Sequence, residues 1–172
     1  DALSEVHRAA VRLLILLPFR KSEFLSCHWT EFDGAWLSIP PERTKNSDAT
    51  SLFLSTFAAA QLPARRNDSD LIFTTDGKVA TRLGSKILTK LREGAGIPQW
   101  QFHDFRRTFS THMHEAVIER MNDQHFVIEA CLNHRDGSRQ GVAGVYNRAQ
   151  YRAQKQAMLQ AWSDLVEVAV GR

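Results

Sequence analysis

Six residues of this chain have the chemical types and the order that phosphoryl transfer needs. They are Arg20, Lys45, His103, Arg106, His134 and Tyr146. Arginine, lysine and histidine can surround a phosphate with hydrogen-bond donors and positive charge. A tyrosine hydroxyl has a pKa of about 10 and needs such charges nearby to act as a nucleophile at neutral pH. The set therefore predicts metal-free phosphoryl transfer to an aromatic oxygen, as in an enzyme that cuts and rejoins DNA.

Two of the six residues, His103 and Arg106, lie three positions apart in the segment FHDFRRTFST, residues 102–111. On a helix this spacing puts both side chains on one face, about one turn apart. A phosphate that meets this face would contact an imidazole and a bidentate guanidinium together. Alone, the pattern is common on exposed first turns of helices, so the prediction depends on the whole set. Arg107 points away from this face and is interpreted as a surface charge or a backbone contact.

The composition is that of an ordinary globular domain. The chain has 172 residues, 43% of them hydrophobic and 24% charged, and a domain of this length can bury its own core. No apolar run approaches the roughly 18 residues of a membrane span, and two cysteines make no disulfide framework. We therefore expect a cytoplasmic protein without membrane contact. The net charge of +3 permits an anionic partner but does not demand one.

Each of the two cysteines has a histidine close by, which raises the question of a zinc site. Cys27 precedes His28, and Cys131 lies three residues before His134. Neither pair has a second half with matching spacing, so both cysteines are interpreted as small, mostly buried thiols. No metal and no cofactor are expected. The other histidines interpreted as surface or packing residues are His112, His114 and His125.

Hydrophobic periodicity predicts a mainly α domain with one small antiparallel β-sheet. Residues 3–17 are predicted to form a helix that Pro18 ends, and Ser22 is predicted to cap a short second helix. Residues 35–39 and 49–55 are predicted to pair as strands, with Lys45 near the tip of their connection. Further helices are predicted over residues 56–62, 81–93, from 103 or 104 to about 116, 124–132 and 148–168. Tyr146 falls in a segment without clear periodicity.

Taken together, these features resemble the catalytic domain of the tyrosine recombinases, the phage integrase family. The resemblance covers nearly all of the chain and depends on segments in the expected order and spacing. These are FRKSEFL at 19–25, RTK at 43–45, FHDFRRTFST at 102–111, CLNH at 131–134 and VYNR at 145–148. The ending resembles the integrases of satellite phages and genomic islands. The implied fold is that of the tyrosine recombinase catalytic domain. Residues 1–172, which begin at Asp1 rather than Met, would be this C-terminal domain without the arm-binding and core-binding domains.

The resemblance implies a role for each cationic or imidazole residue. Arg20 and Arg106 would hold the non-bridging oxygens of the scissile phosphate. Lys45 would be the general acid that protonates the leaving 5′ oxygen. His103 would assist proton transfer at the nucleophile, and His134 would donate a hydrogen bond to the phosphate.

Tyr146 is the implied nucleophile, and Tyr151 is the alternative. Attack would give a 3′-phosphotyrosine and a free 5′ hydroxyl, and the reverse step on a second strand would reseal the DNA without ATP or metal. The implied activity is site-specific integration or excision of a prophage or genomic island. The implied partners are double-stranded DNA with attachment sites, three further copies in a synaptic tetramer, and DNA-bending accessory proteins. The terminal helix, from about Arg148, would dock on a neighbouring subunit or fold back on its own domain.

The chain departs from the family pattern at two positions. Pro18 stands two residues before the first arginine, where the family usually has glycine, and could tilt Arg20. Asn133 stands before the second histidine of the set, where glycine is frequent. Glu23 is predicted to brace the turn of Arg20 without taking part in the chemistry.

The residues alone leave alternatives in other functional classes. One is a DNA-binding module that has lost catalysis, against which the complete set of six residues argues. Another is a metal-independent nuclease or a type IB topoisomerase, and sequence barely separates the topoisomerase from a recombinase. The absence of a carboxylate cluster argues against a metal-dependent nuclease.

Overall fold

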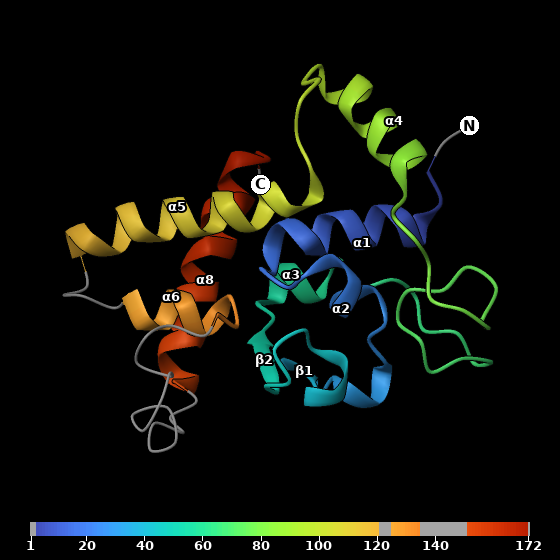
Figure 1. Ribbon diagram of the computed structural model, residues 1–172, viewed down its shortest axis with the longest axis horizontal. Coiled ribbons are helices and arrows are strands. Elements are labelled where there is room, and N and C mark those ends of the chain that lie inside the picture. Colours follow the sequence, from blue (N-terminus) through green and yellow to red (C-terminus); the bar gives the residue numbers. More distant parts are fainter. Residues whose placement is uncertain (1–2, 121–124, 135–150, 172) are drawn as a thin grey trace.

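The computed structural model describes residues 3–120, 125–134 and 151–171, and Figure 1 shows how the elements are arranged. As predicted, the described part of the chain is mainly helical, with one two-stranded antiparallel sheet. Helices α1, α5, α6 and α8 pack against one another, and the sheet lies beside α6 and α8. No helix within these ranges has the length and apolar character needed to cross a membrane.

Helix α1, Glu5–Leu16, lies at the centre of the helical part. The Ser4 hydroxyl caps it by accepting a hydrogen bond from the His7 backbone N–H at 3.3 Å. Apolar residues recur at helical spacing and bury one face against the rest of the core. The helix ends before Pro18, as predicted, because the residue before a proline avoids the helical region.

Helix α2, Lys21–Leu25, follows and buries Glu23 together with its two apolar neighbours. The predicted cap at Ser22 is wrong, because the helix begins earlier and Arg20 occupies the N-cap position with an extended backbone. The Phe24 N–H donates to the Arg20 carbonyl at 3.0 Å, so Ser22 already lies inside the first turn. The side chain of Arg20 thus projects from the start of a helix.

Strands β1, Trp36–Ile39, and β2, Thr50–Phe53, form the predicted antiparallel hairpin, with Leu37 opposite Leu52. The 3₁₀ helix η1, Trp29–Glu31, precedes the hairpin, and η2, Pro41–Arg43, lies in its connection. The second strand is shorter than predicted because Ser55 caps α3, Thr56–Ala59. Its hydroxyl accepts from the Ala58 N–H at 3.0 Å, so the chain turns into a helix there.

Helix α4, Ser85–Ala95, begins later than the predicted residue 81. The Thr81 N–H donates to the Phe73 carbonyl at 2.7 Å, which holds this part of the chain in the preceding loop. At its other end Gly96 adopts φ 65°, and its N–H donates to the Arg92 and Glu93 carbonyls. This left-handed cap ends the helix, because glycine adopts the left-handed conformation more readily than other residues do.

Helices α5, Phe102–Arg120, and α6, His125–Cys131, lie side by side. The Asp104 carboxylate accepts from the Gln101 N–H at 2.7 Å and fixes the start of α5. The helix runs past the predicted end near residue 116 because no proline or glycine interrupts the sequence.

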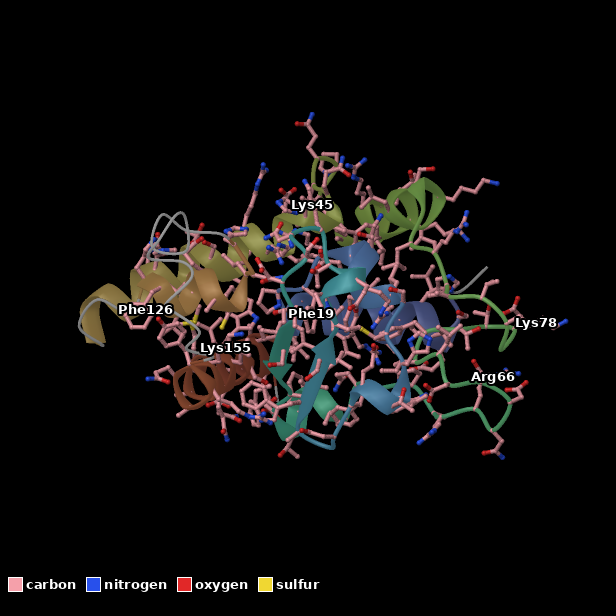
Figure 2. The ribbon with its side chains drawn as sticks, turned by 60° about the horizontal axis from the view of Figure 1, so that its bottom comes forward. Phe19, Lys45, Arg66, Lys78, Phe126 and Lys155 are labelled. Atoms are coloured by element: carbon pink, nitrogen blue, oxygen red, sulfur yellow. The ribbon has the colours of Figure 1, made fainter. Side chains whose placement is uncertain are left out.

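Helix α8, Arg152–Ala169, packs on its own domain, one of the two predicted arrangements. The Trp162 indole N–H donates to the Ile15 carbonyl at 2.9 Å, and its ring meets Phe109 edge-on. The Lys155 ammonium donates to the Ser51 carbonyl at 3.1 Å. Figure 2 shows Lys155 on this helix beside the strands, and Phe19 in the interior of the domain. Residues 148–150, also predicted as helix, lie outside the described residues.

Candidate active site

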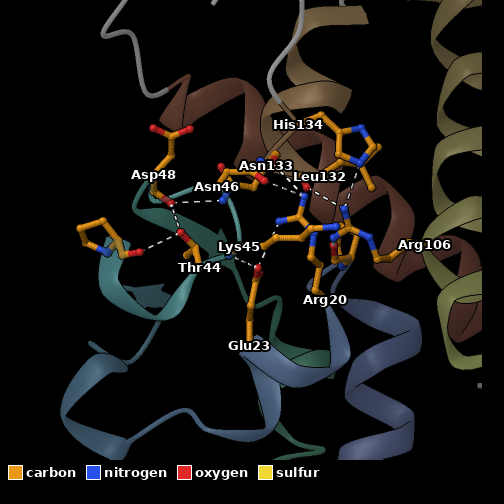
Figure 3. Close-up of polar contacts among 12 residues, drawn as sticks. Arg20, Glu23, Thr44, Lys45, Asn46, Asp48, Arg106, Leu132, Asn133 and His134 are labelled. Carbon is orange, nitrogen blue, oxygen red and sulfur yellow. Dashed lines mark hydrogen bonds and ion pairs between the residues drawn. The ribbon is translucent and has the colours of Figure 1, made fainter.

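Arg106 lies near the start of α5 and joins three segments of the chain. Only 4% of the residue is exposed. One terminal nitrogen, Nη1, donates to the Pro18 carbonyl, and the other, Nη2, donates to the Leu132 carbonyl at 2.7 Å. The same Nη2 lies 3.2 Å from Nε2 of His134. The guanidinium therefore holds the end of α1 and the end of α6 together, as Figure 3 shows around Arg106 and Leu132.

The charge of Arg106 is buried without a carboxylate counter-ion among the described residues. Burial, together with the nearby positive charge of Arg20, lowers its pKa to about 10. The group therefore stays protonated at neutral pH. Its Nε atom is also buried and has no hydrogen-bond partner in the described part of the chain. A buried cation of this kind is suited to bind an anion, because burial of an unpaired charge is otherwise costly.

Arg20 lies beside Arg106 and is held by Glu23, a carboxylate that is only 5% exposed. Nη1 of Arg20 lies 3.2 Å from Oε1 of Glu23, and Nη2 donates to the Asn133 carbonyl at 3.4 Å. The prediction that Glu23 braces Arg20 is confirmed. Pro18 contributes its carbonyl to Arg106, while Arg20 itself is fixed by contacts from three other segments of the chain.

Lys45 lies on the turn that follows η2, as predicted for the tip of the hairpin connection. Its backbone N–H donates to Oε1 of Glu23 at 2.8 Å, the same oxygen that holds Arg20. The Thr44 hydroxyl fixes this turn by donating to the Pro41 and Asp48 carbonyls. The side chain of Lys45 is exposed. Glu23 thus sets the spacing between the lysine turn and the first arginine (Figure 3).

Asn133 makes the turn that brings His134 to Arg106. It is buried and has φ 48°, a left-handed conformation that asparagine tolerates better than most residues. Its carbonyl accepts from the Asn46 amide at 2.6 Å, and its own amide donates to the Asp48 carbonyl at 3.2 Å. Asparagine therefore replaces the frequent glycine without loss of the turn, and it also ties α6 to the hairpin.

One ring nitrogen of His134 contacts the carboxylate of Glu129, and the other contacts the guanidinium of Arg106. Nδ1 lies 2.8 Å from Oε2 of Glu129, and Nε2 lies 3.2 Å from Nη2 of Arg106. Because a guanidinium can only donate, Nε2 is the acceptor and Nδ1 carries the proton. The side chain is 43% exposed, so the imidazole borders both the buried cation and solvent.

His103 is exposed on the first turn of α5, three residues before Arg106. Partial burial lowers its pKa, and the positive charges of Arg106, Arg107 and Arg20 lower it further. The ring is therefore held toward its neutral form, in which one nitrogen can accept a proton. Arg107 is exposed and paired with Asp104 at 3.0 Å, which agrees with its interpretation as a surface charge.

Tyr146 lies outside the described residues, so its position relative to the cations stays a prediction. The alternative, Tyr151, lies at the N-cap of α8 with φ 47°. Its ring centroid is 4.9 Å from that of Phe126. The described structure thus gives Tyr151 a packing contact at the start of a helix.

The interpretation of the two cysteines as buried thiols is confirmed. Cys27 and Cys131 are 0% and 1% exposed, and burial raises the pKa of each thiol to about 12. Such thiols stay protonated at neutral pH and are poor metal ligands.

Sequence reasoning missed the residues that position the cations. Glu129 orients His134, and Asn46 binds the carbonyl that also receives Arg20. The signal for Glu129 was an acidic residue in the last turn of a predicted helix that leads directly to a histidine. Asn46 gave no signal, because its partner lies far away in the sequence.

Comparison with known proteins places these features in a family context. The profile described as "Phage integrase family" matches residues 1–161. The chain is also 28% identical over 176 residues to the prophage integrase IntZ of Escherichia coli strain K12. That alignment covers 93% of this chain and 39% of the relative, so the chain spans well under half of the relative's length. No solved structure matches the chain significantly.

Proposed function

Since the chain belongs to the phage integrase family, we propose that it cuts and rejoins DNA at specific sites through a 3′-phosphotyrosine at Tyr146. The observation that carries the proposal is the cluster around Arg106. A buried guanidinium without a carboxylate partner among the described residues lies next to Arg20 and 3.2 Å from His134. Phosphoryl transfer depends mainly on positioning and charge stabilisation, which such a cluster supplies.

The two arginines would share the charge of the scissile phosphate. Arg106 keeps its Nε without a partner in the described structure, and Arg20 is partly exposed. Glu23 neutralises part of the Arg20 charge and fixes its direction. The phosphate would therefore enter from the exposed side of Arg20 and His134, where two guanidinium groups can each donate to it.

Proton transfer would be divided between His103 and Lys45. His103, with its lowered pKa, can accept the proton of the attacking phenol, because its neutral form is favoured near pH 7. Lys45 would protonate the leaving 5′ oxygen from the turn that Glu23 holds next to Arg20. An acid and a base on opposite sides of the phosphate suit an in-line displacement.

The substrate we propose is double-stranded DNA that carries an attachment site of a prophage or genomic island. Binding would depend on phosphate contacts and would fall steeply as salt increases. Strand exchange would require a synaptic tetramer, with DNA-bending accessory proteins, in the cytoplasm. Met158, Leu159 and Trp162 of α8 are buried against its own domain, so a neighbouring subunit would contact the exposed face of this helix, which includes Leu165 and Val168.

The test is a covalent trap. The protein is incubated without magnesium with a nicked duplex that spans the junction between element and host, and adducts are separated on a denaturing gel. An adduct that forms with the unaltered protein, disappears with Tyr146→Phe and persists with Tyr151→Phe would support the proposal. Binding without an adduct would instead support a DNA-binding module. Relaxation of supercoiled DNA without strand exchange would support a topoisomerase.

A further inference from the structure

Three side chains outside the cation cluster bring metal-ligand atoms together. His114 on α5 and His125 and Glu129 on α6 each offer one ligand atom, and these atoms all lie within 4.8 Å of one another. No other such group is found among the side chains of residues 3–115, 125–134 and 151–171. His114 and Glu129 are partly buried and His125 is exposed, so the group is open to solvent. The interpretation of these histidines as merely surface or packing residues does not explain why a carboxylate joins them.

The two helices present these atoms by their regular geometry. His125 and Glu129 are four residues apart on α6, and this spacing puts both side chains on one face. Helix α5 packs against α6 and supplies His114 from the facing side. The site is therefore built on two helices and not on a loop. Helices hold ligand atoms in place more firmly than loops do.

The hydrogen bond of His114 to the main chain points its free nitrogen into the group. Nδ1 of His114 donates to the Ser110 carbonyl at 2.7 Å, so Nε2 keeps its lone pair. This Nε2 lies 2.7 Å from Nδ1 of His125. Metal-binding histidines usually donate their second N–H to a carbonyl or carboxylate in this way.

We propose that His114, His125 and Glu129 bind a divalent transition-metal ion, such as Zn²⁺ or Co²⁺. Two imidazoles and one carboxylate are a ligand set that Zn²⁺ commonly accepts, with water in a fourth position. Two nitrogens on a tetrahedral ion lie roughly 3.3 Å apart, given bonds of about 2.0 Å. The nitrogens of His114 and His125 need to separate only slightly from their present 2.7 Å.

The metal site shares Glu129 with the cation cluster. Oε2 of Glu129 accepts the Nδ1 proton of His134 at 2.8 Å. A metal ion on this carboxylate would withdraw negative charge from it and weaken its hold on His134. Metal binding would therefore loosen the imidazole that contacts Arg106. Only the resulting inhibition of DNA cleavage depends on the proposed function; the binding itself does not.

The binding test uses protein without a polyhistidine tag, titrated with Co²⁺ and then with Zn²⁺ as competitor. The expected result is one ion per chain, visible as a Co²⁺ absorption band that Zn²⁺ removes. His114→Gln and His125→Gln should each weaken binding at least about tenfold, the scale on which even outer partners of a metal site matter. His112→Gln is the matched control on the same helix, because His112 is exposed and is not part of the group. Equal binding by all four proteins, or no stoichiometric binding, would overturn the proposal.

The link to His134 is read from its ring nitrogens by NMR, independently of any activity. Stoichiometric Zn²⁺ should shift the His134 Nδ1 signal in the unaltered protein and in His112→Gln. It should leave that signal in place in His114→Gln at the same concentration. Glu129→Gln, which keeps the shape of the side chain, should lose both the metal and the shift. If the His134 Nδ1 signal does not change when Zn²⁺ binds, the link is disproved.

Discussion

Nη2 of Arg106 lies 3.2 Å from Nε2 of His134, which makes the histidine an acceptor toward the arginine. The opposite ring nitrogen, Nδ1, then donates a hydrogen bond to Oε2 of Glu129 at 2.8 Å. A carboxylate on α6 thus determines which ring nitrogen of His134 contacts the buried cation on α5.

We expect Glu129→Gln to lower the rate of DNA cleavage by about 10²-fold, the scale of losing one positioned donor. The amide keeps the shape of the side chain but removes the negative charge that holds the Nδ1 proton of His134. The measurement is the single-turnover rate on the nicked duplex. Glu115→Gln is the control, because Glu115 is an exposed residue of α5. Equal rates for both variants would show that the carboxylate is dispensable.

Arg106→Lys should reduce cleavage by about 10²–10³-fold. One ammonium group lacks the planar fork with which the guanidinium reaches the Pro18 and Leu132 carbonyls together. A carbonyl left without its partner should also lower the free energy of unfolding by about 1–3 kcal/mol. Cleavage rates and urea unfolding measure the two effects. Arg107→Lys, at an exposed position paired with Asp104, should change neither.

The sequence identified the cationic residues and the elements that carry them, because helical spacing and the order of the motifs are local properties. The hairpin around Lys45 and the first turn of α5 lie where they were predicted. The partners of those residues depend on contacts between distant segments. The hydrogen bond from the Asn46 amide to the Asn133 carbonyl joins residues far apart in the chain, and periodicity does not reveal it.

Element ends were the least predictable part of the fold. Ser22 looks like a helix cap, but the Phe24 N–H donates to the Arg20 carbonyl, so the helix begins earlier. Thr81 looks like the start of a helix, but the Phe73 carbonyl holds its N–H in a loop. In both cases a backbone hydrogen bond outweighs the preference of a single side chain.

His103 should titrate with a pKa below the ordinary value of about 6.5. Partial burial disfavours its charged form, and Arg106 and Arg107 repel it. Cleavage that needs neutral His103 should therefore persist as pH falls through about 6.5 and decline only at lower pH. Because the unfolded chain binds this proton more readily, the contribution of His103 to stability also falls as pH drops below its unfolded pKa.

NMR titration of the His103 ring gives this pKa directly. Arg107→Gln removes one of the repelling charges and should raise the pKa toward its ordinary value without disturbing Arg106. Thr108→Val changes an exposed neighbour without changing charge and serves as the control. A His103 pKa above the ordinary value, or one indifferent to Arg107, would contradict the electrostatic explanation.

Asn133→Ala should destabilise the protein more than Asn133→Gly. Both variants lose the hydrogen bond from the Asn133 amide to the Asp48 carbonyl. Only alanine also bears the cost of φ 48°, which is about 1–2 kcal/mol for a residue with a Cβ atom and no polar side chain. Urea unfolding should therefore place the alanine variant about 1 kcal/mol below the glycine variant, after the greater freedom of unfolded glycine offsets part of the difference. Equal stability would mean that the turn before His134 relaxes out of the left-handed region, and the contact between His134 and Arg106 should then be lost in the alanine variant as well.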